Sequence, residues 1–359
     1  MRFMKEARRV LLFRLGSLGD TAAILPCFHL IARTFPDAAR FVLTNVQTNV
    51  KASTIESVLG ESGLVHGAME YPLDGMRTVA SLLKLRKRIR AFNPDVLVYM
   101  LEQRHTRNAV LRDLAFFKAC AIPRIVGAPL RRDLFDHRWL PSEQRYENQV
   151  ERLARCLAPL GDARLTDPAS WDVQLDADER ARAAAMVADI PAGSSVIACC
   201  PGTKIDVKDW GEKHWIALFA LLQRTHDDNA IIFIGSLDEH DRSERLRAAW
   251  PGPSVNLCGL TTPREAAAAI ARCTVYLGHD TGPMHIAAAA GLPCVAIFSA
   301  RNKAGEWYPY GSHHHVLYHK TPCFDCRLDI CSEHEKQCIL SITPDEVARA
   351  FREAMSQLA

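Results

Sequence analysis

Gly278-His279-Asp280-Thr281-Gly282-Pro283-Met284-His285 is the stretch from which the fold can be predicted. It follows a short apolar run, 274–277, that is typical of a buried parallel strand. It precedes an alanine-rich segment, 286–290, that is typical of a helix, and Pro283 fits the first turn, where its missing N–H costs nothing. Gly291 ends the helix, and the apolar run 294–298 predicts the next strand. The stretch therefore predicts one βαβ unit with a polar turn at the carboxyl end of a strand.

Open α/β sheets bind ligands at such turns, and the free N–H groups of a helix N-terminus suit a phosphate. We expect the helix to begin at Thr281 or Gly282. Asp280 can accept hydroxyl groups of a sugar or ribose, and His285 can donate to a phosphate oxygen. The alternative is a plain capped turn, in which Asp280 and Thr281 cap the helix and His285 is solvated.

With 359 residues the chain is long enough for two domains of ordinary size. Its net charge of +3 is too small to indicate a nucleic-acid partner. We find no apolar run long enough to span a membrane, and Arg14 interrupts the first apolar run before a signal-peptide core develops. We therefore expect a cytoplasmic protein whose twelve cysteines are mostly reduced.

The first half opens with a predicted strand, 9–15, followed by the turn Gly16-Ser17-Leu18-Gly19-Asp20 and a helix to about Thr34. Two glycines allow a tight turn, but their spacing is not the GxGxxG of a dinucleotide site. Asp20 falls at the helix N-terminus. It is either an N-cap residue or a carboxylate at the mouth of the sheet that points into a cleft.

The same half is locally basic, and its further predicted elements are strands 41–44, 95–100 and 125–127 and a helix, 84–92. Arg104 and Arg107 lie just past the end of strand 95–100, which makes them candidates to bind the acceptor of a reaction. Such charges form either a solvated face or a surface for an anionic acceptor or a membrane.

Residues 157–174 are rich in Pro, Gly, Asp and Ala, which indicates a linker. We place the domains at 1–165 and 166–343, with 344–359 as a terminal helix that can pack back on the first domain. In the second domain the predicted strands are 194–200, 230–235 and 255–259, and the predicted helices are 176–188, 214–224 and 263–273.

Polar groups follow two of these strands. Thr203 and Lys204 come directly after strand 194–200, and Lys208 lies five residues beyond Thr203. A hydroxyl, exposed amides and two lysines at a strand end suit a phosphate. Glu239 follows strand 230–235, where it can hold ribose hydroxyls or cap the next helix.

Four segments of the sequence together resemble glycosyltransferase family 9, the ADP-heptose:lipopolysaccharide heptosyltransferases. They are Arg14–Asp20 with Leu25-Pro26, Pro201-Gly202-Thr203 with Lys208 and Trp210, the stretch His279–His285, and the cysteine-containing tail through Ile342-Thr343-Pro344. The tail looks most like the heptosyltransferase II branch. The resemblance implies the GT-B fold, in which two Rossmann-like open α/β domains face each other across a cleft. It places the acceptor on 1–165 and the nucleotide-sugar donor on 166–343.

The resemblance further implies inverting transfer of a heptose or related sugar from an ADP-sugar to a lipopolysaccharide-core-type or other cell-surface glycan. Such transfer needs a base for the acceptor hydroxyl and stabilisation of the leaving diphosphate. Asp20 is the best candidate base, and Glu102 is its rival. We expect catalysis to need no metal cofactor. The expected donor-binding residues are Thr203, Lys204, Lys208, Glu239, Asp280, Thr281, Gly282 and His285. An anionic glycolipid acceptor implies peripheral contact with the cytoplasmic face of the inner membrane.

Cys323, Cys326, Cys331 and Cys338 have the spacing C-x2-C-x4-C-x6-C in a short polar segment. Four thiolates could hold one tetrahedral zinc or iron, which would be structural because no coordination position stays open. The alternative is a set of reduced thiols or labile disulfides. Two other functions stay open: a GT-B transferase for a different nucleotide sugar such as a UDP-sugar, and a non-catalytic nucleotide-sugar-binding protein with a cysteine switch.

Overall fold

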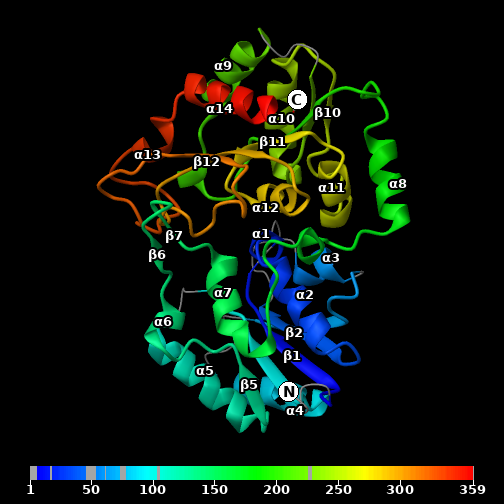
Figure 1. The fold of residues 1–359 in the computed structure, drawn as a ribbon, viewed down its shortest axis with the longest axis vertical. Helices are drawn as coiled ribbons and strands as arrows, with labels where there is room; N and C mark the ends of the chain where they lie inside the picture. Colours follow the sequence, from blue (N-terminus) through cyan, green and yellow to red (C-terminus); the bar gives the residue numbers. More distant parts are fainter. Residues whose placement is uncertain are drawn as a thin grey trace. The chain divides into compact units, whose positions relative to one another are not determined.

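A computed structural model describes residues 6–16, 18–45, 54–60, 62–72, 78–102, 106–224 and 229–358. The chain divides into two compact units, Met1–Gln174 (unit 1) and Leu175–Ala359 (unit 2), each of which is described here by itself (Figure 1). The predicted boundary after residue 165 falls too early. The end of the predicted linker packs on unit 1, because the Trp171 side chain is buried there and the Arg33 guanidinium donates to the Asp162 carbonyl oxygen.

Over the described residues, unit 1 has a parallel sheet with the strand order β3-β2-β1-β4-β5. The strands are β1 (Arg9–Phe13), β2 (Ala39–Asn45), β3 (Gly67–Tyr71), β4 (Val96–Tyr99) and β5 (Arg124–Val126). The chain passes from β1 outward to β2 and β3 and then returns to β4 on the other side of β1. The direction of strand order therefore changes between β1 and β4, which is where open α/β sheets form ligand crevices.

The helices of unit 1 are α1 (Leu18–Ala22), α2 (Leu25–Thr34), α3 (Ile55–Leu59), α4 (Val79–Phe92), α5 (Arg107–Ala119), α6 (Arg132–Phe135) and α7 (Gln149–Leu157), with short 3₁₀ turns η3 (Ala158–Leu160) and η4 (Pro168–Trp171). A small antiparallel hairpin pairs β6 (Trp139–Leu140) with β7 (Arg145–Tyr146). The single helix predicted after the first turn is in fact two, and Pro26, which has no N–H, lies in the first turn of the second.

In the described part of unit 2, the parallel sheet has the order β10-β9-β8-β11-β12-β13. Its strands are β8 (Val196–Cys200), β9 (Ala230–Phe233), β10 (Ser254–Asn256), β11 (Val275–His279), β12 (Cys294–Phe298) and β13 (His315–Tyr318). The predicted βαβ unit is present, since α12 (Gly282–Ala289) joins β11 to β12. The strand order changes direction between β8 and β11, so the loops after these two strands start side by side.

The other helices of unit 2 are α8 (Ala177–Met186), η5 (Asp206–Lys208), α9 (Glu212–Leu222), η6 (Leu237–Glu239), α10 (His240–Ala248), α11 (Pro263–Ile270), α13 (Gln337–Leu340) and α14 (Pro344–Ser356). Capping boxes begin α8, α11 and α14, where each N-cap side chain accepts from a backbone N–H and a glutamate three residues later accepts in return. None of the described helices has the length and apolar character needed to cross a bilayer.

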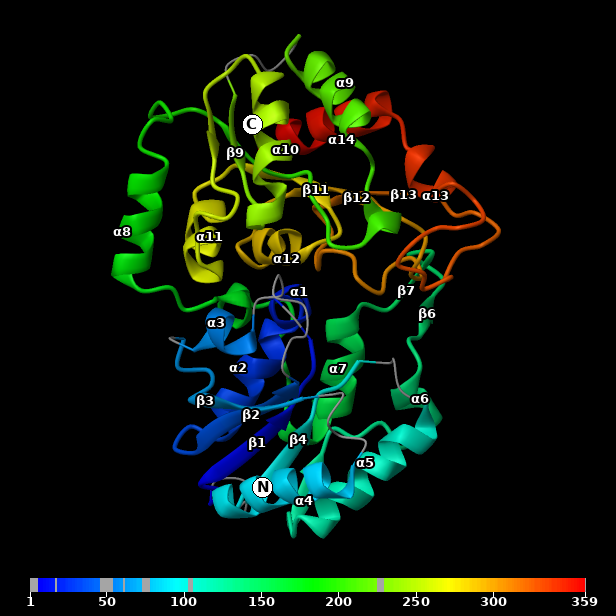
Figure 2. The same ribbon diagram turned by 180° about the vertical axis from the view of Figure 1, so that it is seen from behind.

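The terminal helix α14 belongs to the core of unit 2. Val347, Phe351 and Ala354 lie on one face of the helix and are fully buried together with Trp215 and Phe219. Figures 1 and 2 both show α14 beside α9. This apolar face is thus covered within unit 2, and the expectation that 344–359 packs back on the first domain stays a prediction.

Replacing Phe351 by alanine should destabilise unit 2 by about 3–5 kcal/mol, the cost of removing a buried aromatic ring from a packed core. Trp210, Trp215 and Trp250 lie in the same core. Urea unfolding followed by tryptophan fluorescence therefore measures the loss. Arg352→Ala on the exposed face of α14 is the matched control and should change stability by less than about 0.5 kcal/mol. Equal stabilities of the two variants would show that α14 is not part of the core.

Candidate functional site

A buried ion pair lies where the strand order of unit 2 changes direction. Lys208 Nζ is 2.5 Å from Asp280 Oδ2 and donates a second hydrogen bond to the Asp280 carbonyl oxygen at 3.1 Å. Lys208 ends η5 after β8, and Asp280 follows β11 directly. Their side chains are only 13% and 7% exposed. Two residues predicted to bind the donor, which are far apart in sequence, are thus in direct contact.

His279 fixes the two loops that carry this pair. Its Nε2 accepts from the Trp210 backbone N–H at 3.1 Å, so the neutral ring carries its proton on Nδ1 and donates to the Gly202 carbonyl oxygen at 3.3 Å. The ring is fully buried, and this burial lowers the pKa of His279 to about 4. Trp210 in turn donates its indole N–H to the Ile342 carbonyl oxygen at 2.8 Å, which ties the loop to the core.

Glu239 lies against the loop that follows β8. Its Oε2 accepts from the Ser236 backbone N–H at 2.6 Å, which is the helix-capping role that was one of the two alternatives. A Cβ atom at Gly202 would lie 2.1 Å from Glu239 Oε1, and one at Gly235 would lie 2.3 Å from Oε2. Only glycine at both positions leaves room for this carboxylate. Its predicted role in holding ribose hydroxyls stays a prediction.

The turn before α12 is not the plain capped turn that was the alternative. Thr281 is the N-cap residue, but its side chain makes no capping hydrogen bond. Its Oγ1 lies 3.3 Å from the Tyr276 hydroxyl instead. Gly282 begins the helix. His285 is buried rather than solvated, with Nε2 4.0 Å from Asp280 Oδ1 and its ring against Trp307.

The two remaining donor candidates lie in the loop between β8 and η5. Thr203 is half-buried, and its Oγ1 accepts from the Ile205 backbone N–H at 3.3 Å. Lys204 is exposed. The structure thus gathers Thr203, Lys208 and Asp280 at one edge of the sheet, while Lys204 lies at the surface of the same loop.

In unit 1 a buried arginine occupies the corresponding place between β1 and β4. Arg14 is fully buried; its Nη1 donates to the Met100 carbonyl oxygen at 3.0 Å, and its Nη2 donates to the Asp20 carbonyl oxygen at 2.7 Å. Nη2 also lies 3.3 Å from Glu102 Oε1. One guanidinium therefore joins the two strand ends and both candidate bases.

Asp20 lies inside α1, in its first turn, and is not the N-cap residue. Its side chain lies directly over Gly16, where an added Cβ would be 2.6 Å from Asp20 Cβ and 2.8 Å from its Oδ2. Gly16 also has φ of +133°, a backbone conformation that favours glycine. The two-glycine turn thus brings the carboxylate close to the end of β1, whereas Glu102 uses one oxygen to bind Arg14.

The structure describes one of the two predicted acceptor residues. Arg107 is exposed in the first turn of α5. Arg104 lies outside the described residues. Their role stays a prediction.

The structure gives no support to the metal site predicted at Cys323, Cys326, Cys331 and Cys338. Among the residues that it describes, no group of three or more His, Cys, Asp or Glu side chains is placed to hold a metal ion. None of the four thiols is in a disulfide; burial, with a smaller contribution from the other three thiols, raises the pKa of Cys338.

Hydrogen bonds and ion pairs hold the cysteine segment. The buried Arg301 donates to the carbonyl oxygens of Leu328 and Arg327 at 2.9 and 3.1 Å. Arg327 pairs with the buried Glu306 at 2.8 Å. These contacts attach the segment to the loop after β12.

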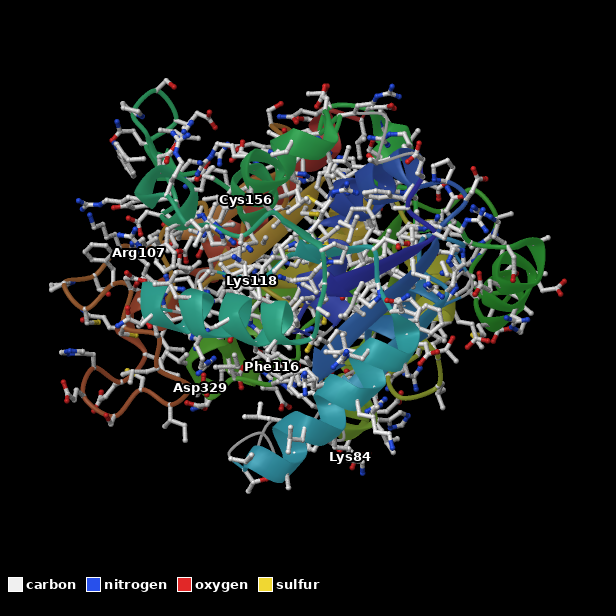
Figure 3. All side chains as sticks on the ribbon, turned by 90° about the horizontal axis from the view of Figure 1, so that it is seen from below. Lys84, Arg107, Phe116, Lys118, Cys156 and Asp329 are labelled. Atoms are coloured by element: carbon white, nitrogen blue, oxygen red, sulfur yellow. The ribbon has the colours of Figure 1, made fainter. Side chains whose placement is uncertain are left out.

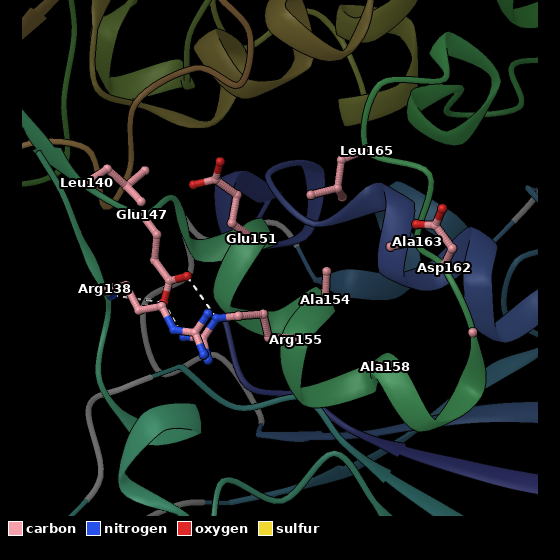
Figure 4. Close-up of a pocket in the computed structure, with 11 residues that line it drawn as sticks. Arg138, Leu140, Glu147, Glu151, Ala154, Arg155, Ala158, Asp162, Ala163 and Leu165 are labelled. Atoms are coloured by element: carbon pink, nitrogen blue, oxygen red, sulfur yellow. Dashed lines mark hydrogen bonds and ion pairs between the residues drawn. The ribbon is translucent and has the colours of Figure 1, made fainter. Parts of the chain in front are cut away.

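A cavity of about 450 Å³ lies elsewhere in unit 1 (Figure 4). Its walls come from α7, the β6–β7 hairpin and the segment 161–165, and its lining residues are Arg138, Leu140, Glu147, Glu151, Ala154, Arg155, Ala158, Gly161, Asp162, Ala163 and Leu165. Arg155 pairs with Glu147 in its wall. None of the predicted site residues lines it, so we do not assign it to the site.

Sequence reasoning missed the positioning roles of Arg14 and His279. Arg14 stands at the end of an apolar run, where a buried charge needs partners, and that signal was available. The role of His279 depends on Trp210 and Gly202, which lie 69 and 77 residues away in sequence, so local pattern could not reveal it.

Comparison with known proteins places these observations in a family context. A family model described as glycosyltransferase family 9 (heptosyltransferase) matches residues 83–337. Lipooligosaccharide heptosyltransferase 2 of Haemophilus influenzae is 34% identical over 108 residues, which cover 29% of this chain and 31% of that protein. Lipopolysaccharide heptosyltransferase 2 of Salmonella typhimurium is 25% identical over 276 residues, which cover 71% of this chain and 77% of that protein. The chain thus spans less than two thirds of the first relative.

The solved structure of a family 9 glycosyl transferase from Veillonella parvula matches with a TM-score of 0.72 at 14% identity, covering 98% of each chain. At this identity the likeness shows the fold alone. The predicted fold class, GT-B with two Rossmann-like open α/β domains, is confirmed.

The buried neutral state of His279 predicts a pH dependence of stability. Because its pKa is about 4 in the folded protein and near 6.5 when unfolded, the stabilising contribution is complete above pH 6.5 and is lost as pH falls towards 4. Between pH 7 and pH 4.5 the loss should be roughly 2–3 kcal/mol. His279→Gln, whose amide can accept and donate in the same directions without titrating, should lack this part of the loss in urea unfolding. Equal pH dependence in both proteins would contradict the assignment.

Proposed function

Because this chain belongs to glycosyltransferase family 9, we propose that it transfers a heptose or a related sugar from an ADP-sugar to a lipopolysaccharide-core-type acceptor, with inversion at the anomeric carbon. The resemblance found in the sequence, and with it the enzyme class, is confirmed by the family match over residues 83–337. The donor, the acceptor and the stereochemistry are the content of the proposal.

The observation that carries the proposal is the Lys208–Asp280 pair where the strand order changes direction. In the transfer, the bond between the anomeric carbon and the diphosphate oxygen breaks, and negative charge develops on the leaving ADP. In this proposal the Lys208 ammonium and the N–H groups that begin α12 stabilise that charge. Asp280 Oδ1, which lies 4.0 Å from His285 Nε2, then accepts from sugar hydroxyls, and Glu239 holds the ribose.

On the acceptor side, Asp20 takes the hydroxyl proton as the acceptor oxygen forms its bond to the anomeric carbon. Two contacts support Asp20 over Glu102 in this role. Arg14 fixes the Asp20 backbone by donating to its carbonyl oxygen, whereas it contacts Glu102 at the carboxylate itself. Gly16 lets the Asp20 side chain come close to the end of β1.

The acceptor is an anionic glycolipid in this proposal, and the enzyme meets it at the cytoplasmic face of the inner membrane. Basic residues of unit 1, with Arg107 at the start of α5, support an anionic partner. The cysteine segment has no part in the reaction.

The direct test is incubation of the purified protein with ADP-heptose and a core-type acceptor, with mass spectrometry of the product and NMR of the new anomeric centre. ADP and UDP are compared as competitors. Transfer from a UDP-sugar but from no ADP-sugar would replace the proposal by a different GT-B transferase. Tight binding of ADP-heptose without any transfer would favour a nucleotide-sugar-binding protein.

In this assay Asp20→Asn should bind the donor normally but transfer at least ~100-fold more slowly, because asparagine keeps the shape and cannot take the proton. Glu102→Gln is the matched control, and its main effect should be on stability through Arg14. Near-normal turnover of Asp20→Asn at saturating substrates, together with a severe loss in Glu102→Gln, would transfer the role of base to Glu102.

A further inference from the structure

The outer face of α4 combines a high positive charge with exposed aliphatic side chains. The helix carries five basic residues and no acidic residue. Leu85 and Ile89 point into the core of unit 1 and are buried. Leu83 and Lys87, one helical turn apart, lie on the opposite side and are exposed. The core explains one side of the helix. On the other side Arg86 and Arg88 donate to the carbonyl oxygens of Ala119 and Glu70, while Val79, Leu83, Lys84 and Lys87 are exposed.

Helix α5 extends this face. It packs on the same core as α4 through Val110 and Phe117, and Arg86 of α4 donates to the carbonyl oxygen of Ala119 at 2.8 Å. Figure 3 shows both helices on one face of the molecule, with Lys84, Arg107 and Lys118 labelled. The exposed basic residues of the two helices are Lys84, Lys87, Arg88, Arg90, Arg107, Arg112 and Lys118. We call this surface the α4–α5 face.

The acidic side chains that the structure describes in α5 and just before β4 are already engaged. Asp113 is the one acidic residue of the two helices, and it is already held by Arg112 at 2.8 Å and by the Tyr99 hydroxyl at 3.0 Å. Asp95, at the start of β4, accepts from the backbone N–H groups of Arg8 and Arg9. Most of the positive charge therefore faces solvent.

The exposed aliphatic residues lie near one end of this face. Val79, Leu83 and Leu111 are 73%, 55% and 49% exposed, and all three are in the first two turns of their helices. Helices that follow parallel strands begin at the carboxyl edge of the sheet. The aliphatic end is thus the end nearest to Asp20 and Arg14, which lie at that same edge.

From these observations we infer that the α4–α5 face binds the surface of a bilayer that contains anionic lipids. Lys and Arg pair with lipid phosphates, while Val79, Leu83 and Leu111 enter the boundary between headgroups and acyl chains. The carboxyl edge of the unit 1 sheet then lies near the bilayer, where a glycolipid acceptor would be anchored. The last step rests on the proposed function, but the binding itself does not.

Sedimentation of the full-length protein with vesicles tests this inference. Vesicles of phosphatidylcholine with added phosphatidylglycerol should bind the protein, and vesicles of phosphatidylcholine alone should bind it much more weakly. Each basic residue near an anionic surface contributes roughly five-fold to affinity. Lys84→Glu with Lys87→Glu removes four units of positive charge and should weaken binding at least ~50-fold. High salt screens the electrostatic attraction to the vesicles. The binding that remains at high salt should be weaker in the double variant Val79→Ser with Leu83→Ser.

The matched control is Lys213→Glu with Arg272→Glu, which makes the same charge change at exposed positions of unit 2 and should leave vesicle binding unchanged. Transfer to a deacylated, water-soluble acceptor, measured in parallel, should be the same in all variants. Because this readout is independent of lipid, an absence of transfer would count against the proposed function and not against the surface.

Three results would overturn the inference. They are equal binding to both kinds of vesicle, equal losses in the α4 variant and its unit 2 control, and binding to heparin or RNA with none to anionic vesicles.

Discussion

Two opposite charges held out of water constrain the site of unit 2. Taking a lysine and an aspartate from solvent costs several kcal/mol per ion, and only close contact with further hydrogen bonds offsets that cost. Lys208 and Asp280 meet this condition because β8 and β11 are adjacent strands and because His279 fixes the two loops. In the proposed function the pair favours one kind of ligand. A diphosphate can replace Asp280 as the partner of Lys208, whereas a neutral ligand would leave the lysine without a counter-charge.

Unit 1 meets the same constraint with a different residue. At the point where its strand order changes direction, Arg14 binds the ends of β1 and β4 and the backbone of Asp20. Five guanidinium donors allow one side chain to make all these contacts, which a lysine could not do with the same geometry. The two sheets thus each have a largely buried cation at the carboxyl edge: Arg14 holds the backbone of Asp20, and Lys208 is paired with Asp280.

Local sequence pattern predicted the elements whose signals are local. Apolar runs, Pro283 and Gly291 indicated the correct positions of the β11–α12–β12 unit, the end of β12 and the loop after β8. The strands β3 and β13 were not predicted, because each lies at the edge of its sheet and neither is a continuous apolar run. The site residues were identified by their position after strands, but their contacts depend on partners tens of residues away. The metal site stays a prediction, because cysteine spacing says nothing about the contacts of Arg301 and Arg327 that hold the segment.

A double-mutant cycle on donor binding tests the central claim that the Lys208–Asp280 pair forms the donor site. ADP-heptose is titrated calorimetrically into the wild type, Lys208→Ala, Asp280→Asn and the double variant. If both residues act on one diphosphate-sugar, Lys208→Ala should cost about 1.5–3 kcal/mol of binding free energy. The two effects should also be non-additive by at least about 0.5 kcal/mol, as for residues in one network. Donor affinity that is unchanged in both single variants would contradict the account.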